Sequence, residues 1–180
     1  MRYVALNSRK RFVFNAVMWL VSSIVCLALS CPLSAAAPQD SLRARSSENV
    51  KLIHSDLLYK NRLDAKADVL VGNVRLYHDG MFLDCDSARF YKEENTFNAY
   101  GNVKMTQGDT LSLTSDTLLY DGPMMQAHAV GNAVLTHGNT VLTTSVIDYD
   151  RLEGIGFYPQ HGVLVDGDNV LDSDYGQYTP

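Results

Sequence analysis

The sequence has little cysteine. Only three of its 180 residues are cysteines, and two of them, Cys26 and Cys31, fall in or beside an apolar stretch near the N-terminus. Beyond that stretch Cys85 is the one remaining thiol, which excludes an internal disulfide there. This part of the chain must therefore be stabilised by a hydrophobic core. Its roughly 140 residues are enough for one domain of ordinary size.

Basic residues are also scarce beyond position 36. Eleven Lys and Arg remain there against twenty Asp and Glu, which gives a net charge near −9. Nucleic-acid binding is disfavoured, because it needs clustered cations to neutralise phosphates. Tight capture of anionic head groups by a basic patch is disfavoured as well. An anionic amphiphile would have to be held mainly by its apolar part.

The N-terminus, by contrast, opens with four basic residues, followed by an apolar run over 12–30 and a stretch of small residues. This order is typical of a secretory leader, and Ser34 and Ala36 provide small residues before a cleavage site. We therefore expect residues 1–36 to be an export signal. Two alternatives stay open. About 18 apolar residues can just span a bilayer and so could be retained as an anchor, and Cys31 lies in a loose lipoprotein box that would permit lipidation.

Residues 37–49 are polar and rich in Ser and Arg, which predicts a flexible tether. Residues 50–180 are then expected to form the folded domain. Helical periodicity is nearly absent from this domain.

A unit of about 30 residues is repeated along the domain. The strings "GNVRLYHDG", "GNVKMTQGD" and "GNAVLTHGN" begin at Gly72, Gly101 and Gly131, spaced by 29 and 30 residues, and a weaker copy begins at His161. Such a period is typical of stacked repeat units. We interpret Gly-Asn as a tight corner that recurs at the same place in every layer.

Inside each unit the hydrophobic period is two. Val103 and Met105, and later Leu111 and Leu113, alternate with polar residues, which predicts half-buried strands. The segments "HDG", "QGD", "HGN" and "DGD" supply the Gly, Asn and Asp that hairpin turns require.

A second marker follows each turn, namely a small or acidic residue with an aromatic residue four positions later. Its five occurrences are Ser55–Tyr59, Asp86–Phe90, Asp116–Tyr120, Ser145–Tyr149 and Asp174–Tyr178. We interpret the tyrosines as a packing ladder, with sugar binding as the alternative.

Together these patterns predict an all-β fold, an open and twisted stack of antiparallel strands with two to three strands per repeat. One unit alone cannot bury enough apolar surface, but four stacked units can.

This cycle of "GNV", a Gly-containing turn and an aromatic marker, following a leader, resembles the OstA-like (organic solvent tolerance) family of lipopolysaccharide-transport proteins. The resemblance covers residues 50–180. It implies a β-jellyroll with an apolar trough, carriage of lipopolysaccharide across the periplasm, and a bridge of molecules joined end to end by strand addition. The resemblance also implies a carrier and not an enzyme. The low Arg and Lys content is a departure from this resemblance, because it is low for contact with phosphorylated head groups.

The sequence ends within or at the end of the fourth unit, which leaves an edge for assembly or for a longer chain. The implied partners are the acyl chains of lipopolysaccharide, other transport components that add to a β-edge, and a second copy in head-to-tail association.

An open trough could accept acyl chains, and we expect its lining to come from the apolar positions of the strands. The alternative is that these side chains simply pack against one another as core. The candidate lipid-binding residues are Val74, Leu76, Phe82, Phe90, Val103, Met105, Leu111, Leu113, Leu118, Ala133, Leu135, Val141 and Ile147. A bulge would exchange Leu118 with Leu119, so the direction of this pair stays open.

We expect neither a metal nor another cofactor. Asp84, Cys85 and Asp86 lie together, but no His or Cys spacing matches a zinc or nucleophile motif. Asp86 also fills a repeating position, so a hydrogen bond at a turn or edge is the simpler role, and Cys85 is expected to be a small packed residue.

Two other functions remain as alternatives. One is a structural or adhesive β-repeat protein that assembles through exposed strand edges. The other is a carbohydrate-active enzyme, which would need an exposed carboxylate cluster on a continuous face.

Overall fold

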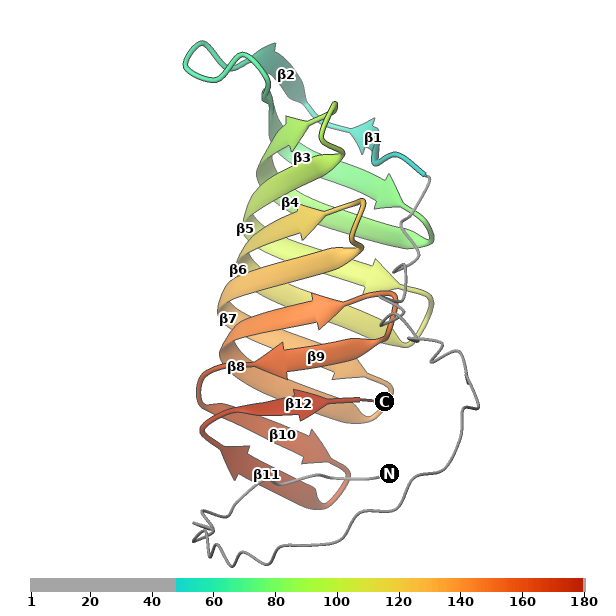
Figure 1. Ribbon diagram of the computed structural model, residues 1–180, viewed down its shortest axis with the longest axis vertical. Coiled ribbons are helices and arrows are strands. Elements are labelled where there is room, and N and C mark those ends of the chain that lie inside the picture. The colour runs from blue at the N-terminus through green and yellow to red at the C-terminus, as the bar shows by residue number, and fades with distance from the viewer. Residues whose placement is uncertain (1–47, 180) are drawn as a thin grey trace, which may run out of the picture. The chain divides into compact units, whose positions relative to one another are not determined.

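The computed structural model describes residues 48–179, which form one twelve-stranded antiparallel sheet (Figure 1). The strands are β1 (Lys51–His54), β2 (Leu57–Lys60), β3 (Asp68–His78), β4 (Met81–Tyr91), β5 (Thr96–Gln107), β6 (Leu111–Asp121), β7 (Gln126–His137), β8 (Thr140–Asp150), β9 (Ile155–Tyr158), β10 (Gly162–Asp166), β11 (Asn169–Ser173) and β12 (Gly176–Tyr178). Among these residues no helix has the length and apolar character needed to cross a membrane.

The expected leader (1–36) and most of the expected tether (37–49) lie outside the described residues. The predicted all-β, open and repetitive fold is confirmed.

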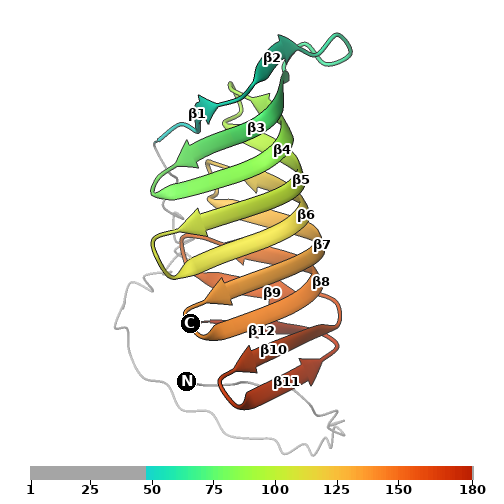
Figure 2. The ribbon, with the colours of Figure 1, turned by 180° about the vertical axis from the view of Figure 1, so that it is seen from behind.

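Each repeat contributes one hairpin, and the hairpins pair in chain order from β3 to β8. Every long strand is bent near its middle, so the sheet folds back on itself into two facing walls (Figures 1 and 2). One wall carries β1, β10 and β11, and we call it the β10 wall. The other carries β2, β9 and β12, and we call it the β9 wall.

The bend lies at the Gly-Asn pairs, inside strands and not between them. In β5, Gly101 and Asn102 are two residues opposite the single residue Asp116 of β6, which is the arrangement of a β-bulge. Both have positive φ, 75° and 46°. The bulges at Gly72 in β3 and Gly131 in β7 are placed in the same way. The sequence correctly identified a recurring corner, but the corner bends a strand and does not join two.

The bulges also connect successive repeats. The Asn102 side-chain amide of β5 donates to the Asp86 carboxylate of β4 at 2.8 Å. A Cβ on Gly101 would lie 2.4 Å from that carboxylate, so only glycine fits. Because Asp86 belongs to the preceding hairpin, each corner fastens one repeat to the next. We call this line of corners the spine.

The predicted turns join strands within hairpins. Asp79 and Gly80 connect β3 to β4, and their positive φ values of 45° and 76° are typical of a two-residue type I′ turn. The turn from β5 to β6 has three residues, Gly108 to Thr110. This difference in turn length decides which side chains face inward.

One of the predicted markers is wrong by one residue. The carboxylate that meets the first corner belongs to Asp56 and not to its neighbour Ser55, since Asn73 donates to Asp56 at 2.9 Å. Tyr59 is consequently 47% exposed on the outer face, whereas Tyr120 and Tyr149 are buried. The aromatic ladder therefore begins at Phe90 and does not include Tyr59.

Candidate functional site

The interior between the walls contains a continuous line of leucines. Cross-strand pairing places one leucine or methionine beside the next from β1 to β11, with every strand of the β10 wall contributing one. We call this set the leucine row: Leu52, Leu76, Leu83, Met105, Leu113, Leu135, Leu142, Leu164 and Leu171. The residues from Leu76 to Leu164 are buried, whereas Leu171 at the far end is 45% exposed.

The β9 wall contributes a second buried row with smaller side chains. Three of its six members are alanines, so this wall leaves more width between the sheets than leucines would. The row consists of Leu70, Ala88, Ala99, Leu118, Ala129 and Ile147. Leu118 is fully buried and Leu119 is 42% exposed, which decides the pair that the sequence left open.

Eleven of the thirteen candidate lipid-binding residues are buried in this common core. They are Val74, Leu76, Phe90, Val103, Met105, Leu111, Leu113, Leu118, Ala133, Leu135 and Ile147. Phe82 and Val141 are not among them. The two-residue turns begin the next strand with an inward residue, Met81 or Thr140, so Phe82 and Val141 point to the outer face.

The inward positions on those two strands are Leu83 and Leu142, which the sequence reasoning missed. Counting in steps of two from the turn would have found them, because the side-chain period of a strand is two.

The edge of the interior opposite the spine is a seam between two rows of connections. The turns of the β10 wall (79–80, 108–110, 138–139) lie on one side, and the connections of the β9 wall (92–95, 122–125, 151–154) lie on the other. Hydrogen bonds cross this seam.

Arg151 makes two of these cross-seam bonds and is only 4% exposed. It follows β8 on the β9 side. Its Nε donates to Gln107 Oε1 at 2.9 Å, and its Nη2 donates to the Asp79 carbonyl at 2.8 Å, both on the opposite side. Its Nη1 donates to the Tyr120 hydroxyl at 2.6 Å. All three acceptors are neutral.

A chain of hydrogen bonds continues from Tyr120 to the start of the domain. The Tyr120 hydroxyl lies 2.7 Å from Nδ1 of His78, and Nε2 of His78 lies 3.0 Å from the Glu48 carbonyl. A carbonyl can only accept, so Nε2 carries the proton and Nδ1 accepts from the tyrosine. Burial, together with the nearby Arg151 charge, lowers the pKa of His78.

Tyr120 is held in place by its ring. The ring stacks on Phe97 with centroids 4.9 Å apart, and burial raises the pKa of its hydroxyl. The hydroxyl is therefore a neutral group with a fixed position.

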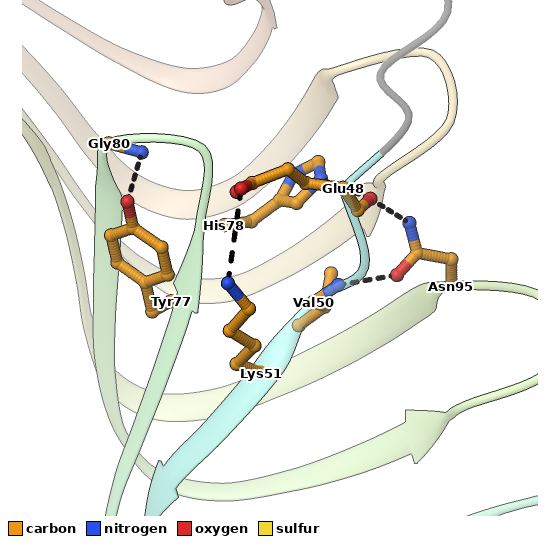
Figure 3. A network of polar contacts seen from close by, with 7 residues as sticks. All are labelled: Glu48, Val50, Lys51, Tyr77, His78, Gly80 and Asn95. Atoms are coloured by element: carbon orange, nitrogen blue, oxygen red, sulfur yellow. Dashed lines mark hydrogen bonds and ion pairs between the residues drawn. The ribbon is translucent and has the colours of Figure 1, made fainter.

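The segment before β1 lies over the same seam (Figure 3). Asn95 accepts from the Val50 amide at 2.6 Å and donates to the Glu48 carbonyl at 3.1 Å, so its side chain holds two points of the backbone. Val50 is buried in the core. No local pattern marks Arg151, His78 or Asn95, because each depends on partners distant in sequence.

The "LDCDS" segment has a structural role. Asp84 pairs with Arg75 at 3.1 Å, and Asp86 accepts from Asn102 at the spine. Cys85 is buried, its thiol lies 3.3 Å from the Ser87 carbonyl, and burial raises its pKa to about 12. Within residues 48–179, no three His, Cys, Asp or Glu side chains are grouped to hold a metal ion.

A hollow of about 480 Å³ lies on the outer face of the β9 wall. Its outward-facing lining includes Leu119, His128, Asp148 and Phe157. These residues alternate with the inward ones, so this hollow is separate from the leucine row.

Comparison with known proteins agrees with this geometry. Residues 47–180 match the family model described as OstA-like protein. Among solved structures, the chain is similar to LptH from Pseudomonas aeruginosa, described as the LptA-homologous periplasmic component of the conserved lipopolysaccharide transport device. The TM-score is 0.57 and the identity 13%, over 77% of this chain and 99% of that one. Comparison with curated protein sequences gives no significant match.

Proposed function

This chain belongs to the OstA-like protein family, and on that premise we propose that it is a periplasmic carrier that holds lipopolysaccharide by its acyl chains. It would form part of a bridge that passes the lipid toward the outer membrane. The protein would contribute binding and not covalent chemistry, so it would act as a carrier without enzymatic activity. The predicted export signal would deliver it to the periplasm.

The observation that carries this proposal is the leucine row. It is unbroken from Leu52 to Leu171 along the stack of strands, and no charged side chain interrupts it. Burial of a methylene group contributes about 0.8 kcal/mol, so about ten methylenes could contribute about 8 kcal/mol before ordering costs. Such contacts have no preferred direction, so an acyl chain could slide from one leucine to the next.

An acyl chain requires the walls to separate, because the row is buried between them. At the spine the walls are continuous strands, whereas at the seam they are joined by side-chain and turn contacts. Separation at the seam would replace leucine–alanine contacts by leucine–lipid contacts of the same apolar kind. The free-energy difference between the closed and the lipid-filled states can then be small.

Strand edges at both ends of the stack support assembly into a bridge. β11 is the last strand of the β10 wall, and Val170 in it is 67% exposed. At the other end, Ile53 of β1 and Leu57 of β2 are also exposed. An exposed edge can pair with a strand of another transport component or of a second copy.

The same edges favour a second candidate function, a structural β-repeat protein that only polymerises. This alternative needs the edges but not the leucine row. Lipid contact inside the protein separates the two.

Site-specific photo-crosslinking tests the proposal. A photoreactive residue at Leu113 or Met105 lies in the leucine row, and one at Leu119 lies on the outer face of the neighbouring wall. We expect lipopolysaccharide adducts from the two interior positions and few from position 119. Equal labelling, or no labelling from either interior position in folded protein, would favour the structural alternative.

A further inference from the structure

Arg151 is held differently from the surface cations of the domain. Four of those cations lie beside carboxylates and are at least half exposed; these pairs are Lys51–Glu48, Lys60–Asp68, Lys66–Glu94 and Arg75–Asp84. The Arg151 guanidinium is buried instead, and its three acceptors are an amide, a hydroxyl and a main-chain carbonyl. Among residues 48–179 no carboxylate lies within ion-pair distance of this guanidinium, so its loss of water on burial is not offset by a direct ion pair.

The position of Arg151 connects this charge to the proposed lipid path. Tyr120, one of its acceptors, stands in the inner row of the β9 wall beside Phe97. Leu118, two residues away on the same face, belongs to the alanine-rich row opposite the leucines. The guanidinium therefore lies at the seam, one side chain away from the apolar interior.

The bonds of Arg151 also hold the seam closed. Gln107 and Asp79 are on the opposite side, so separation of the walls at this point requires both bonds to break. The bond to Tyr120 lies on Arg151's own side and can remain. Separation would thus free two sets of guanidinium N–H donors at the moment when the interior becomes accessible.

We propose that the seam at Arg151 is the lateral entrance for the lipid, and that Arg151 binds the anionic phosphate of its head group there. This inference rests on the proposed function. In the lipid-free protein the guanidinium fastens the seam through Gln107 and Asp79. When an acyl chain enters along the leucine row, the guanidinium exchanges these neutral acceptors for the phosphate oxygens.

Two general properties support this exchange. Arginine presents a planar fork of donors that matches phosphate in a bidentate arrangement. A guanidinium bonds more strongly to an anionic acceptor than to a neutral one, so the phosphate would supply the direct ion pair that Arg151 lacks in the closed seam. One well-placed guanidinium is compatible with a domain that carries few cations.

The test compares two fluorescent amphiphiles with the same acyl chains, one with a phosphate monoester head and one with an uncharged sugar head. The affinity ratio between them is measured on the full-length chain for wild type, Arg151→Gln and Arg151→Lys. We expect wild type to prefer the phosphate, Arg151→Gln to reduce that preference by about tenfold, and Arg151→Lys to retain part of it. The control is Arg89→Gln, which removes the same charge from an exposed position beside Tyr100.

Arg151→Gln can also weaken the fold, so Gln107→Ala is measured as a second variant. It removes one cross-seam acceptor and keeps the charge. We expect it to speed the uptake of both amphiphiles and to retain the phosphate preference.

An affinity ratio in Arg151→Gln equal to wild type would overturn the proposal, as would an equal loss in Arg89→Gln. If Arg151→Gln does not fold, unchanged uptake rates in Gln107→Ala would overturn it instead. If wild type binds neither amphiphile, the proposed function itself fails, and the inference fails with it. These outcomes are distinguishable because only the last one is read from wild type alone.

Discussion

The Asn102 side chain donates a hydrogen bond to the carboxylate of Asp86, sixteen residues earlier and in the preceding hairpin. The same bond, at 2.8 Å, joins Asn132 to Asp116. These bonds explain why the sequence repeats Gly-Asn and an acidic residue together. The acidic residue of one unit fits the corner of the next, so the repeat is fastened between units and not within one.

The Gly101 corner predicts that Gly101→Ala destabilises the fold. Its φ is positive and its Cβ would overlap the Asp86 carboxylate, so we expect a loss of about 2–4 kcal/mol in the free energy of unfolding. Gly108→Ala is the matched control, because Gly108 also has positive φ but no atom within 4 Å of an added Cβ. It should cost about 1 kcal/mol. Urea titration monitored by circular dichroism measures both, and equal losses would contradict the role of the corner.

The leucine row predicts that Leu113→Ala is strongly destabilising. Leu113 is fully buried, so we expect a loss of about 2–5 kcal/mol. Leu119→Ala changes the same side chain on the outer face and should cost less than about 1 kcal/mol. Thermal and urea unfolding of the two variants provide the comparison. Similar losses at both sites would mean that the outer face is covered in solution.

The neutral state of His78 predicts a loss of stability in acid. Its pKa in the folded protein is lowered from the ordinary 6.5, so below about pH 6.5 the unfolded chain takes up a proton that the folded chain does not. The free energy of unfolding should therefore fall as the pH decreases below about 6.5, with no contribution from this residue above it.

The variant His78→Gln should show a shallower fall over the same interval, because its side chain does not titrate. Urea titrations at a series of pH values check this prediction, and an unchanged slope in His78→Gln would contradict it.

Cys85 should be unreactive in the native protein. Burial raises its pKa to about 12, so almost no thiolate is present near pH 8. We expect iodoacetamide to leave the peptide that contains Cys85 unmodified under native conditions and to modify it fully in urea. Mass spectrometry of that peptide distinguishes it from Cys26 and Cys31. Rapid native modification would show that the spine opens locally.

The exposed edge predicts concentration-dependent self-association. Val170→Lys places a charge on the last strand of the β10 wall and should weaken association in sedimentation velocity experiments. Phe82→Lys is the control, since Phe82 is 39% exposed but lies within the sheet. Equal effects would indicate that any added cation disrupts association.

Local periodicity was enough to predict the strands, the turns and the repeat, because each of these depends on residues close in sequence. The same reasoning misplaced Phe82 and Val141, since a turn one residue shorter reverses which side chains face inward. It also assigned the first marker to Ser55 instead of Asp56, because both of these adjacent residues fit the description of a small or acidic residue. The hydrogen bonds that close the seam could not be predicted from the sequence. Arg151 meets Asp79 across 72 positions of sequence, and nothing near either residue signals the pairing.

The Gly-Asn bends of the spine recur in β3, β5 and β7, but the buried arginine does not recur. Arg151 directly follows β8, and the positions that directly follow β4 and β6 hold Lys92 and Gly122. Adding a copy of the β3–β4 or β5–β6 hairpin would lengthen the leucine row without adding a second arginine at this position. A longer stack of this kind would therefore keep one proposed lateral entrance, next to the β7–β8 hairpin.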